Sequence, residues 1–455
     1  MSGQNKKMEL LGSTPIPKAL LAMGIPTMIG MMINALYNLV DAYFVGGLGT
    51  SQMGAISVTF PLGQVVVGLG LLFGSGAASA VSRLLGNHEK DKADRVVSTA
   101  VYGSVLVGAV VILCVVVFLN PILKLLGATP SILPYARTYA RIYIISSIFN
   151  VFNVAMNNIV TSEGAAKTTM GALLTGAILN MVLDPVFINV LDFGVAGAAI
   201  ATAISQMIST LVYLYYIRKG KSIFTFRIKE CHFSKEIISE ILKIGIPTLI
   251  FQLLTSLAVA LINMEAKGYG DSVIAGMGAV TRLISMGSLM VFGFIKGFQP
   301  IAGYSYGAKN YVRLKEAIKI SIIWSTVFCV FFGGILALLS KPVISQFTDH
   351  DLEMIRIGSY ALRANGLSFM LFGFYTVHSS LFLALGKAKE GMILGTCRQG
   401  ICFVPAILFL PMLFGVNGII YAQPAADVLS AVVTIVMAIR FEASLEKRMR
   451  VETAG

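Results

Sequence analysis

Residues 24–29, GIPTMI, recur almost unchanged as GIPTLI at residues 245–250, which lie 221 positions further along the chain. The same shift, applied without gaps, brings other turn and small residues into register. It pairs Gly47 with Gly268, Gly49 with Gly270, Gly76 with Gly297, Gly86 with Gly307, Pro121 with Pro342, Tyr139 with Tyr360, and GVAG at 194–197 with GVNG at 415–418. The chain is therefore predicted to be an internal repeat of two halves.

The composition places both halves in a membrane. Of 455 residues, 56% are hydrophobic and 13% are charged, and the mean hydropathy is +0.81. A soluble protein has about 45–50% apolar and 25% charged residues. Apolar runs long enough to cross a bilayer occur twelve times. They cover roughly residues 15–45, 52–82, 96–119, 132–160, 166–190, 194–217, 236–266, 273–305, 312–339, 353–383, 388–414 and 417–440.

The predicted fold is thus an all-α polytopic membrane protein with twelve transmembrane helices in two six-helix lobes. Six is an even number, so both halves enter the membrane in the same orientation, and we expect a pseudo-two-fold axis along the membrane normal. Secondary transporters with a central cavity use this plan. The predicted parts are an N-lobe at 1–217, a cytoplasmic linker at 218–235, a C-lobe at 236–440 and a C-terminal tail at 441–455.

The net charge of +13 comes from basic residues whose distribution along the chain is that of a membrane protein. Most basic residues lie in alternate connections and in the two tails, which is the positive-inside pattern, and we therefore expect both termini in the cytoplasm of a cell-membrane protein. This distribution argues against nucleic-acid binding. The first span begins at residues 13–18, STPIPK, without a short apolar core and cleavage site, so we expect no removable signal peptide. The five cysteines lack metal-type spacing and are interpreted as apolar fillers.

The source of energy is constrained by missing motifs. The sequence has no phosphate-binding G-x-x-x-x-G-K-[ST] motif, and its longest polar connection, residues 218–235, is too short for an ATPase domain. We find no nucleophile elbow and no His/Glu metal spacing, so an enzyme is not expected. Uphill transport would need an ion gradient. Pro26 and Pro247, at equivalent places in the repeat, predict bends of the kind found near transport pathways, although a static kink is an equal alternative.

Four segments together carry a resemblance to a known family. They are GLGLLFGSGAASAVSRLLG at 68–86, GFIKGFQPIAGYSYGAKNYVRLKEA at 293–317, CRQGICFVPAILFLP at 397–411 and QPAADVLS at 423–430. The chain resembles the multidrug and toxic compound extrusion (MATE) family over essentially its whole length. The resemblance implies export of drug-like, often cationic or aromatic, compounds from the cytoplasm against entry of Na⁺ or H⁺.

Carboxylates in the first and fifth spans form the candidate ion site. Asp41 follows Tyr37 and Asn38 on one helical face, and Asn180 and Asp184 are four residues apart, so they share a face of another helix. Counted from the nearest loops, Asp41, Asp184 and Thr202 all lie about 8–12 Å inside the outer surface at 1.5 Å per residue. We therefore expect them at one depth in one bundle.

This oxygen-rich group suits a hard cation, and Na⁺ is one candidate. It suits a proton equally well, because two acids in a low-dielectric site do not both stay ionised without a large energetic penalty. Asp41, Asn180, Asp184 and Thr202 also match the cation-site positions of the N-lobe in the resembled family. The plain alternative for each is a structural hydrogen bond, and Thr202 could simply bond a carbonyl of its own helix.

Other polar residues within the spans are candidates for a substrate cavity: Asn34, Tyr37, Asn38, Asn153, Asn157, Lys296 and Gln299. The asparagines could equally bond between helices. Lys296 falls where the repeat has Ser75, deep in the eighth span, where an uncompensated ammonium is expensive. It could snorkel, pair with a carboxylate such as Asp427, or contact substrate, and in the last case it would disfavour cationic drugs.

Two other classes remain as alternatives. A lipid-linked precursor flippase of related fold would want a cavity rich in Arg and Lys and usually has fourteen spans. A channel or scaffold would need neither repeated prolines nor a buried acid pair. An exporter of one specific metabolite is a further alternative, which differs from a multidrug exporter only in its substrate. We expect no cofactor beyond the coupling ion Na⁺ or H⁺. The expected partners are small organic substrates, the coupling cation and the lipid bilayer, with the monomer as the functional unit.

Overall fold

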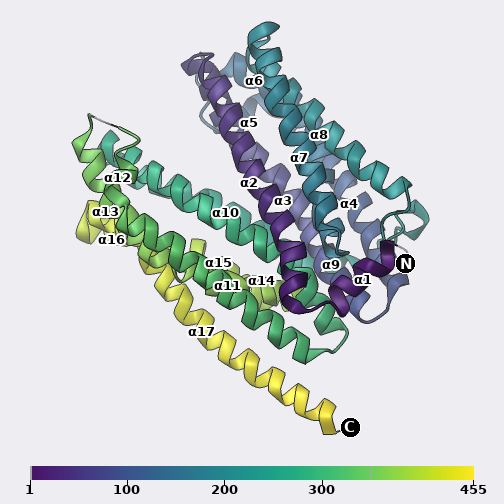
Figure 1. Cartoon of the computed structure of the whole chain (residues 1–455). Coiled ribbons are helices and arrows are strands. Elements are labelled where there is room, and N and C mark those ends of the chain that lie inside the picture. The colour runs from purple at the N-terminus through teal and green to yellow at the C-terminus, as the bar shows by residue number, and fades with distance from the viewer. Residues whose placement is uncertain (1–2, 349, 455) are drawn as a thin grey trace.

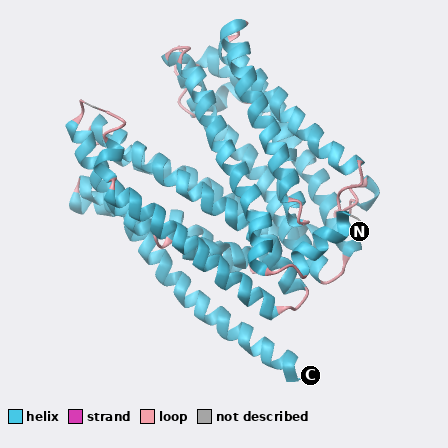
Figure 2. Ribbon diagram, viewed as in Figure 1, coloured by secondary structure: helices cyan, strands magenta, loops and turns pink. Residues whose placement is uncertain are grey.

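A computed structural model describes residues 3–348 and 350–454. Throughout these residues the secondary structure is helical, with short connections and no strand (Figure 2). Eleven helices are long and apolar enough to cross a membrane, and the number is twelve if the bent pair α13 and α14 counts as one span. The predicted all-α, multi-pass fold is therefore confirmed.

The first half consists of the helices α1 to α8. Their bounds are α1 Gly3–Gly12, α2 Ile16–Gly46, α3 Thr50–Gly86, α4 Lys90–Val117, α5 Leu119–Leu125, α6 Leu133–Ser162, α7 Ala166–Pro185, the π-helical turn η1 Val186–Val190, and α8 Gly194–Arg218. The second half follows the 3-10 turn η2 Ile228–Glu230. It contains α9 Lys235–Lys267, α10 Asp271–Gly307, α11 Tyr311–Leu338, α12 Ser340–Ile344, α13 Leu352–Phe369, α14 Phe372–Ala384, α15 Ala388–Thr396, the π-helical turn η3 Cys397–Ile401, α16 Phe403–Phe414 and α17 Val416–Ala454.

The helix boundaries repeat with the shift that the sequence shows. Both ends of α3 and of α4 reappear 221 residues later as the ends of α10 and α11. The turns repeat as well: Gly49 and Gly270 have φ angles of 107° and 105°, and His88 and Lys309 have 59° and 57°. A φ near 105° is accessible essentially only to glycine, which explains glycine at both positions before the long helices.

The halves differ at three places. Where the first half has the continuous helix α6, the second has α13 and α14, bent by 50° at their junction. In the second half the π-helical turn η3 comes early in its span, whereas η1 comes at the end of α7. The last helix α17 continues without a break to Ala454, through the stretch predicted as a separate tail. Pro26 and Pro247 lie inside α2 and α9, which both continue past them.

The two halves meet near the end of the molecule that carries both chain termini and diverge toward the opposite end (Figure 1). Glycines allow the backbones to touch there. A Cβ on Gly297 of α10 would lie 2.6 Å from the backbone nitrogen of Gly24 in α2. One on Gly86 would lie 2.1 Å from the Tyr304 carbonyl oxygen, and one on Gly307 would lie 2.0 Å from that of Arg83.

These last two contacts are reciprocal. Gly86 and Gly307 are partners in the repeat, and so are Arg83 and Tyr304, which lie 221 positions apart. A two-fold relation produces such swapped pairs. Polar contacts join the same region: Thr27 donates to the Gly293 carbonyl at 2.6 Å, and Arg83 donates to Glu240 at 3.0 Å.

Aromatic packing continues from this contact into the second half. The ring of Phe294 lies against Gly24, at a distance of 2.8 Å from a Cβ placed there. Its other neighbour is Trp324 of α11, with ring centroids 6.1 Å apart. Trp324 is the only tryptophan of the sequence.

Candidate functional site: a buried acid pair between α2 and α7

Asp184 is wholly buried near the end of α7, and neither carboxylate oxygen has a hydrogen-bond partner. Asn180 lies one turn earlier on the same face, as its spacing predicts, and is 1% exposed. Its amide nitrogen donates to the Thr202 hydroxyl of α8 at 3.3 Å, while its carbonyl oxygen has no partner. Pro185 follows directly and lacks an N–H, and the backbone changes there to the π-helical turn η1.

Asp41 reaches the same place from α2. It is half-buried, its Oδ1 is buried without a partner, and its carboxyl group lies within electrostatic range of that of Asp184. The structure therefore brings together all four residues of the candidate cation site, from the three helices α2, α7 and α8.

Tyrosines surround the pair. Tyr37 lies within electrostatic range of both carboxyl groups, and so does Tyr139 of α6. Tyr143 stacks on Tyr139 with ring centroids 5.7 Å apart and also lies near Asp41. Sequence reasoning missed Tyr139 and Tyr143 as site residues. Their sequence signal is two phenols four residues apart, which places both on one helical face.

The arrangement is chemically incomplete. Asp41 Oδ1, Asn180 Oδ1 and both oxygens of Asp184 are buried acceptors without donors. Buried acceptors left unpaired cost about 1–3 kcal/mol each, and more if charged. A proton or a hard cation supplies what is missing, because the unpaired atoms of the four candidate residues are all oxygens. Among the described residues no three His, Cys, Asp or Glu side chains gather as a metal site, so the arrangement does not resemble a transition-metal centre.

Three of the predicted cavity residues lie in different settings. Asn34 and Asn38 are exposed on α2, and the Asn38 amide donates to the Asn34 carbonyl at 2.7 Å. Asn153 is buried, and its nitrogen donates to the backbone and side-chain oxygens of Gln206 at 2.8 and 2.9 Å. Its oxygen accepts from Thr210 at 2.9 Å. Asn153 therefore ties α6 to α8 within the first half and has no free donor for a substrate.

Lys296 does not pair with Asp427. That carboxylate instead accepts from Arg398 at 2.8 Å, from Gln423 at 2.8 Å and from Ser368 at 2.8 Å, all within the second half. The Arg398 guanidinium is a better partner because its fork can also lie over the Phe372 ring, at 4.6 Å. The Lys296 ammonium donates to Asn157 Oδ1 of the first half, and Gln299 is half-buried one turn further along α10.

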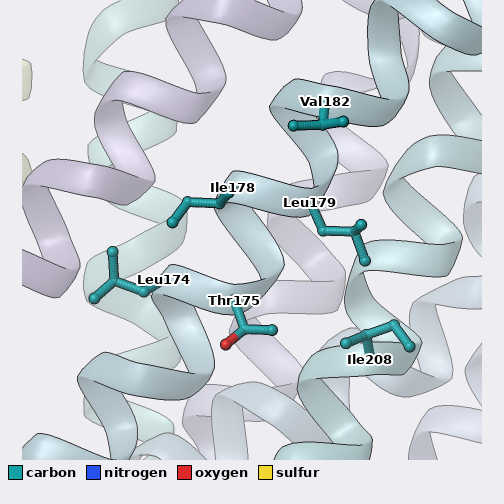
Figure 3. Close-up of a pocket in the computed structure, with 6 residues that line it drawn as sticks. All are labelled: Leu174, Thr175, Ile178, Leu179, Val182 and Ile208. Carbon is teal, nitrogen blue, oxygen red and sulfur yellow. The ribbon is translucent and has the colours of Figure 1, made fainter.

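A surface groove of the first half lies elsewhere and is apolar. It has a volume of about 460 Å³ and is formed by Leu174, Thr175, Ile178, Leu179 and Val182 of α7 with Ile208 of α8 (Figure 3). Ile178 and Val182 are more than half exposed, as side chains facing lipid would be. Asp184 lies on another face of α7 and does not border the groove, so this groove is not the chemical site.

A second buried acid was missed altogether. Glu163 follows α6, is wholly buried, and accepts from the Ser222 hydroxyl and the Ile223 backbone nitrogen, both at 2.7 Å. It also accepts from Tyr216 and, at 3.2 Å, from Lys7 of α1. The sequence signal for it is one acidic residue, followed directly by Gly164, in a short turn on the side of the membrane where the basic residues gather. This cluster holds the start of the linker to the first half.

Comparison with known proteins agrees with this architecture. The family model described as MatE matches residues 26–186 and 247–408, two segments whose starts differ by the repeat length. Multidrug export protein MepA of Staphylococcus aureus (strain NCTC 8325 / PS 47) is 29% identical over 435 residues, covering 95% of this chain and 96% of that protein. MepA of Staphylococcus saprophyticus is 29% identical over 421 residues, covering 92% and 93%.

Solved structures match over nearly the whole chain. A crystal structure of MATE in complex with MaL6 has a TM-score of 0.92 and 28% identity, covering 97% of this chain and 99% of that one. A MATE family transporter of the MOP superfamily in an outward-facing conformation has a TM-score of 0.91 and 27% identity over the same shares.

Fold and site define a multi-pass membrane transporter and not an enzyme. Within that class, the chain belongs to the MATE family, as the resemblance of its motifs had implied.

Proposed function

We propose that this protein is a secondary active exporter of drug-like organic compounds, driven by inward movement of Na⁺ or H⁺ through the Asp41–Asp184 site. The observation that supports the proposal most is the set of buried oxygens without donors, on Asp41, Asn180 and Asp184. The names of the similar staphylococcal proteins, which are multidrug export proteins, support the direction and kind of transport.

The proposed mechanism is alternating access between the two halves. Ion binding shifts the balance of two states only through a difference in affinity between them. A shift from 1:99 to 99:1 needs about 5.5 kcal/mol. Two neighbouring carboxyl groups that lack donors supply a large part of this difference, because an arriving cation relieves both the repulsion and the missing bonds.

The proposal also covers the membrane, the orientation of the chain in it and the number of chains that act together. The basic connections support a cell-membrane protein with both termini in the cytoplasm, and the divergence of the halves away from the termini supports an outward-open state here. All four residues of the candidate cation site belong to one chain, which supports a functional monomer.

The experiment is export by purified protein in liposomes, with the Na⁺ and pH gradients imposed one at a time. Asp41→Asn and Asp184→Asn should each abolish gradient-driven export at normal insertion, and Thr202→Ala should weaken Na⁺ dependence more than H⁺ dependence. Asp271→Asn, which changes an exposed acid at the start of α10, is the matched control and should export normally. Full coupled export by Asp41→Asn would refute the assignment.

A further inference from the structure

We propose that Lys296 binds an acidic group, such as a carboxylate, sulfonate or phosphate, of the exported compound. The inference rests on the exporter function proposed above and narrows its substrate class to organic anions.

The position of Lys296 is unusual for a lysine. It lies about 16 Å from the end of α10 at Gly307, at 1.5 Å per residue, within an apolar helix. Its neighbours in the chain, Ile295 and Gly297, are buried, whereas Lys296 itself is half-buried. Lys296 also borders a small cavity, so its side chain is not packed on every side.

Its electrostatic surroundings leave the charge uncompensated. In the described part of the chain, no carboxylate lies within ion-pair distance of Lys296, and its one hydrogen-bond acceptor is the neutral amide oxygen of Asn157. Asp427 is occupied by Arg398. Asp41 lies about 21 Å further along α2 than Thr27, which borders the same space as Lys296. A cation left in this state inside a membrane protein is expensive, so an intramembrane charge is by default a functional group.

A small cavity adjoins the ammonium. It is bordered by Lys296 and by Asn157, Thr27 and Thr169, whose polar groups come from α6, α2 and α7. Its volume of about 10 Å³ holds no more than one water molecule. The cavity lies across the contact between the halves, which Thr27 bridges to Gly293 at 2.6 Å. It can therefore enlarge to receive a compound when the halves separate at this end.

Binding of an organic acid would change the hydrogen-bond partner of Lys296 from Asn157 to the acidic group. The bond from Lys296 to Asn157 crosses from the second half to the first, so it must break when the halves part. A carboxylate or phosphate is a stronger acceptor for the ammonium than an amide oxygen, because the attraction between opposite charges adds to the hydrogen bond. An organic anion would replace Asn157 and release one link between the halves, whereas a cationic compound would meet a like charge.

The test uses five probes that share one ring and differ in the attached group. They are naphthalene-1-carboxylate, naphthalene-1-sulfonate, 1-naphthyl phosphate, neutral 1-naphthalenemethanol and the cation (1-naphthylmethyl)trimethylammonium. Each is assayed by thermal stabilisation of the purified protein and by gradient-driven export from liposomes. Both assays are repeated with chloride replaced by gluconate.

Four variants accompany the wild type. Lys296→Met should weaken the apparent affinity for the anions about ten- to hundred-fold, the loss expected for a hydrogen bond between charged groups. Lys296→Arg should retain anion binding. Asn157→Asp supplies an internal carboxylate that competes with the probe, so it should lose anion binding without a lower unfolding temperature, which keeps the test decisive if Lys296→Met folds poorly. Lys319→Gln removes an exposed lysine of α11 and should behave as the wild type.

Preferential binding and export of the anions, lost in Lys296→Met and Asn157→Asp, would support the inference. Equal anion binding by Lys296→Met, preference for the trimethylammonium probe, stabilisation by chloride alone, or binding of no anionic probe would each overturn it. Gradient-driven export of the cation would overturn the substrate class and leave the exporter function standing. Anion binding through Lys296 without export of any probe would support the acid-binding site and count against the exporter function.

Discussion

Asp184 keeps both carboxylate oxygens without a donor, although no part of its side chain reaches the surface. Proteins normally satisfy such atoms, and a buried charge without partners persists only where a ligand or proton completes it. The neighbouring Asn180 shows the contrast within one side chain, because its nitrogen is bonded to Thr202 and its oxygen is not. In Asp184 and Asn180, therefore, the side-chain oxygens lack hydrogen-bond partners, whereas the one side-chain donor, the Asn180 amide nitrogen, has one.

Sodium should therefore stabilise the wild-type protein against unfolding. A ligand at one hundred times its Kd adds about 2.7 kcal/mol to the free energy of unfolding. Asp184→Asn should lose this response, and without sodium it should unfold no more easily than the wild type, because its new amide can donate to Asp41. Thermal unfolding in sodium and in choline buffers measures both effects. A sodium response retained by Asp184→Asn would remove Asp184 from the site.

At the scale of single helices, α13 begins outside the membrane, where the carboxylate of Asp351 caps its first turn. Asp351 accepts from the Met354 backbone nitrogen at 2.9 Å and from the Ser272 hydroxyl at 2.7 Å. These bonds favour the charged form and lower the pKa of Asp351 below its ordinary value. The cap joins α13 to the start of α10, so it fixes two elements of the second half at once.

Asp351→Ala should lower the unfolding temperature at pH 7. Because the pKa in the folded state is depressed, the stabilisation is fully present above the unfolded value of about 3.9 and is lost as the pH falls through the folded one. The difference between variant and wild type should therefore shrink below about pH 4. Unfolding temperatures measured from pH 7 to pH 3 test this, and a difference independent of pH would mean that the charge has no part in the cap.

Two glycines of α10 should respond in opposite ways to the same change. A Cβ at Gly297 would meet the α2 backbone at 2.6 Å, whereas one at Gly278 would meet nothing within 4 Å. Gly297→Ala should push the halves apart and lower stability by about 1–3 kcal/mol, the usual range for overpacking. Gly278→Ala should be neutral or should stabilise by up to about 1 kcal/mol through helix propensity. Denaturation of both variants decides, and equal effects would contradict the close contact.

At the scale of the whole molecule, the buried acid Glu163 anchors the start of the linker. Glu163 holds Ser222 and Ile223 through bonds of 2.7 Å, and Gln4 of α1 donates to the Ser222 carbonyl at 2.8 Å. The connection between the halves is therefore docked on the first half before it enters α9. Further along, Asp94 accepts from the Thr225 backbone nitrogen and Thr99 from that of His232, both at 3.0 Å, so the linker stays on the first half almost to the start of α9.

Glu163→Gln should free the linker. An amide cannot accept all the donors that converge there, and each one left unpaired costs about 1–3 kcal/mol. Trypsin should then cut within residues 218–235 about tenfold faster or more, since 1.4 kcal/mol corresponds to a factor of ten. Glu9→Gln, an exposed acid on α1, should be cut at the wild-type rate. Unchanged cleavage of Glu163→Gln would show that other contacts hold the linker.

The sequence predicted most of this architecture because the repeat and the apolar runs are local patterns that need no knowledge of packing. It predicted that Asp41 and Asp184 meet because depth in a membrane can be counted from the loops. It did not reveal the break between α13 and α14, because that stretch is apolar throughout and carries no proline. Nor did it pair Asp427 with Arg398 or find the Glu163 cluster, since partners far apart in the chain are chosen by packing.

The contact between Phe294 and Gly24 has a practical consequence. Trp324 packs against the Phe294 ring, and it is the sole indole in the chain. Any opening of the halves at this end withdraws α2 from Phe294 and changes the polarity around that indole. The protein therefore carries a built-in optical reporter, whose emission wavelength can follow the transport cycle in real time without an attached dye.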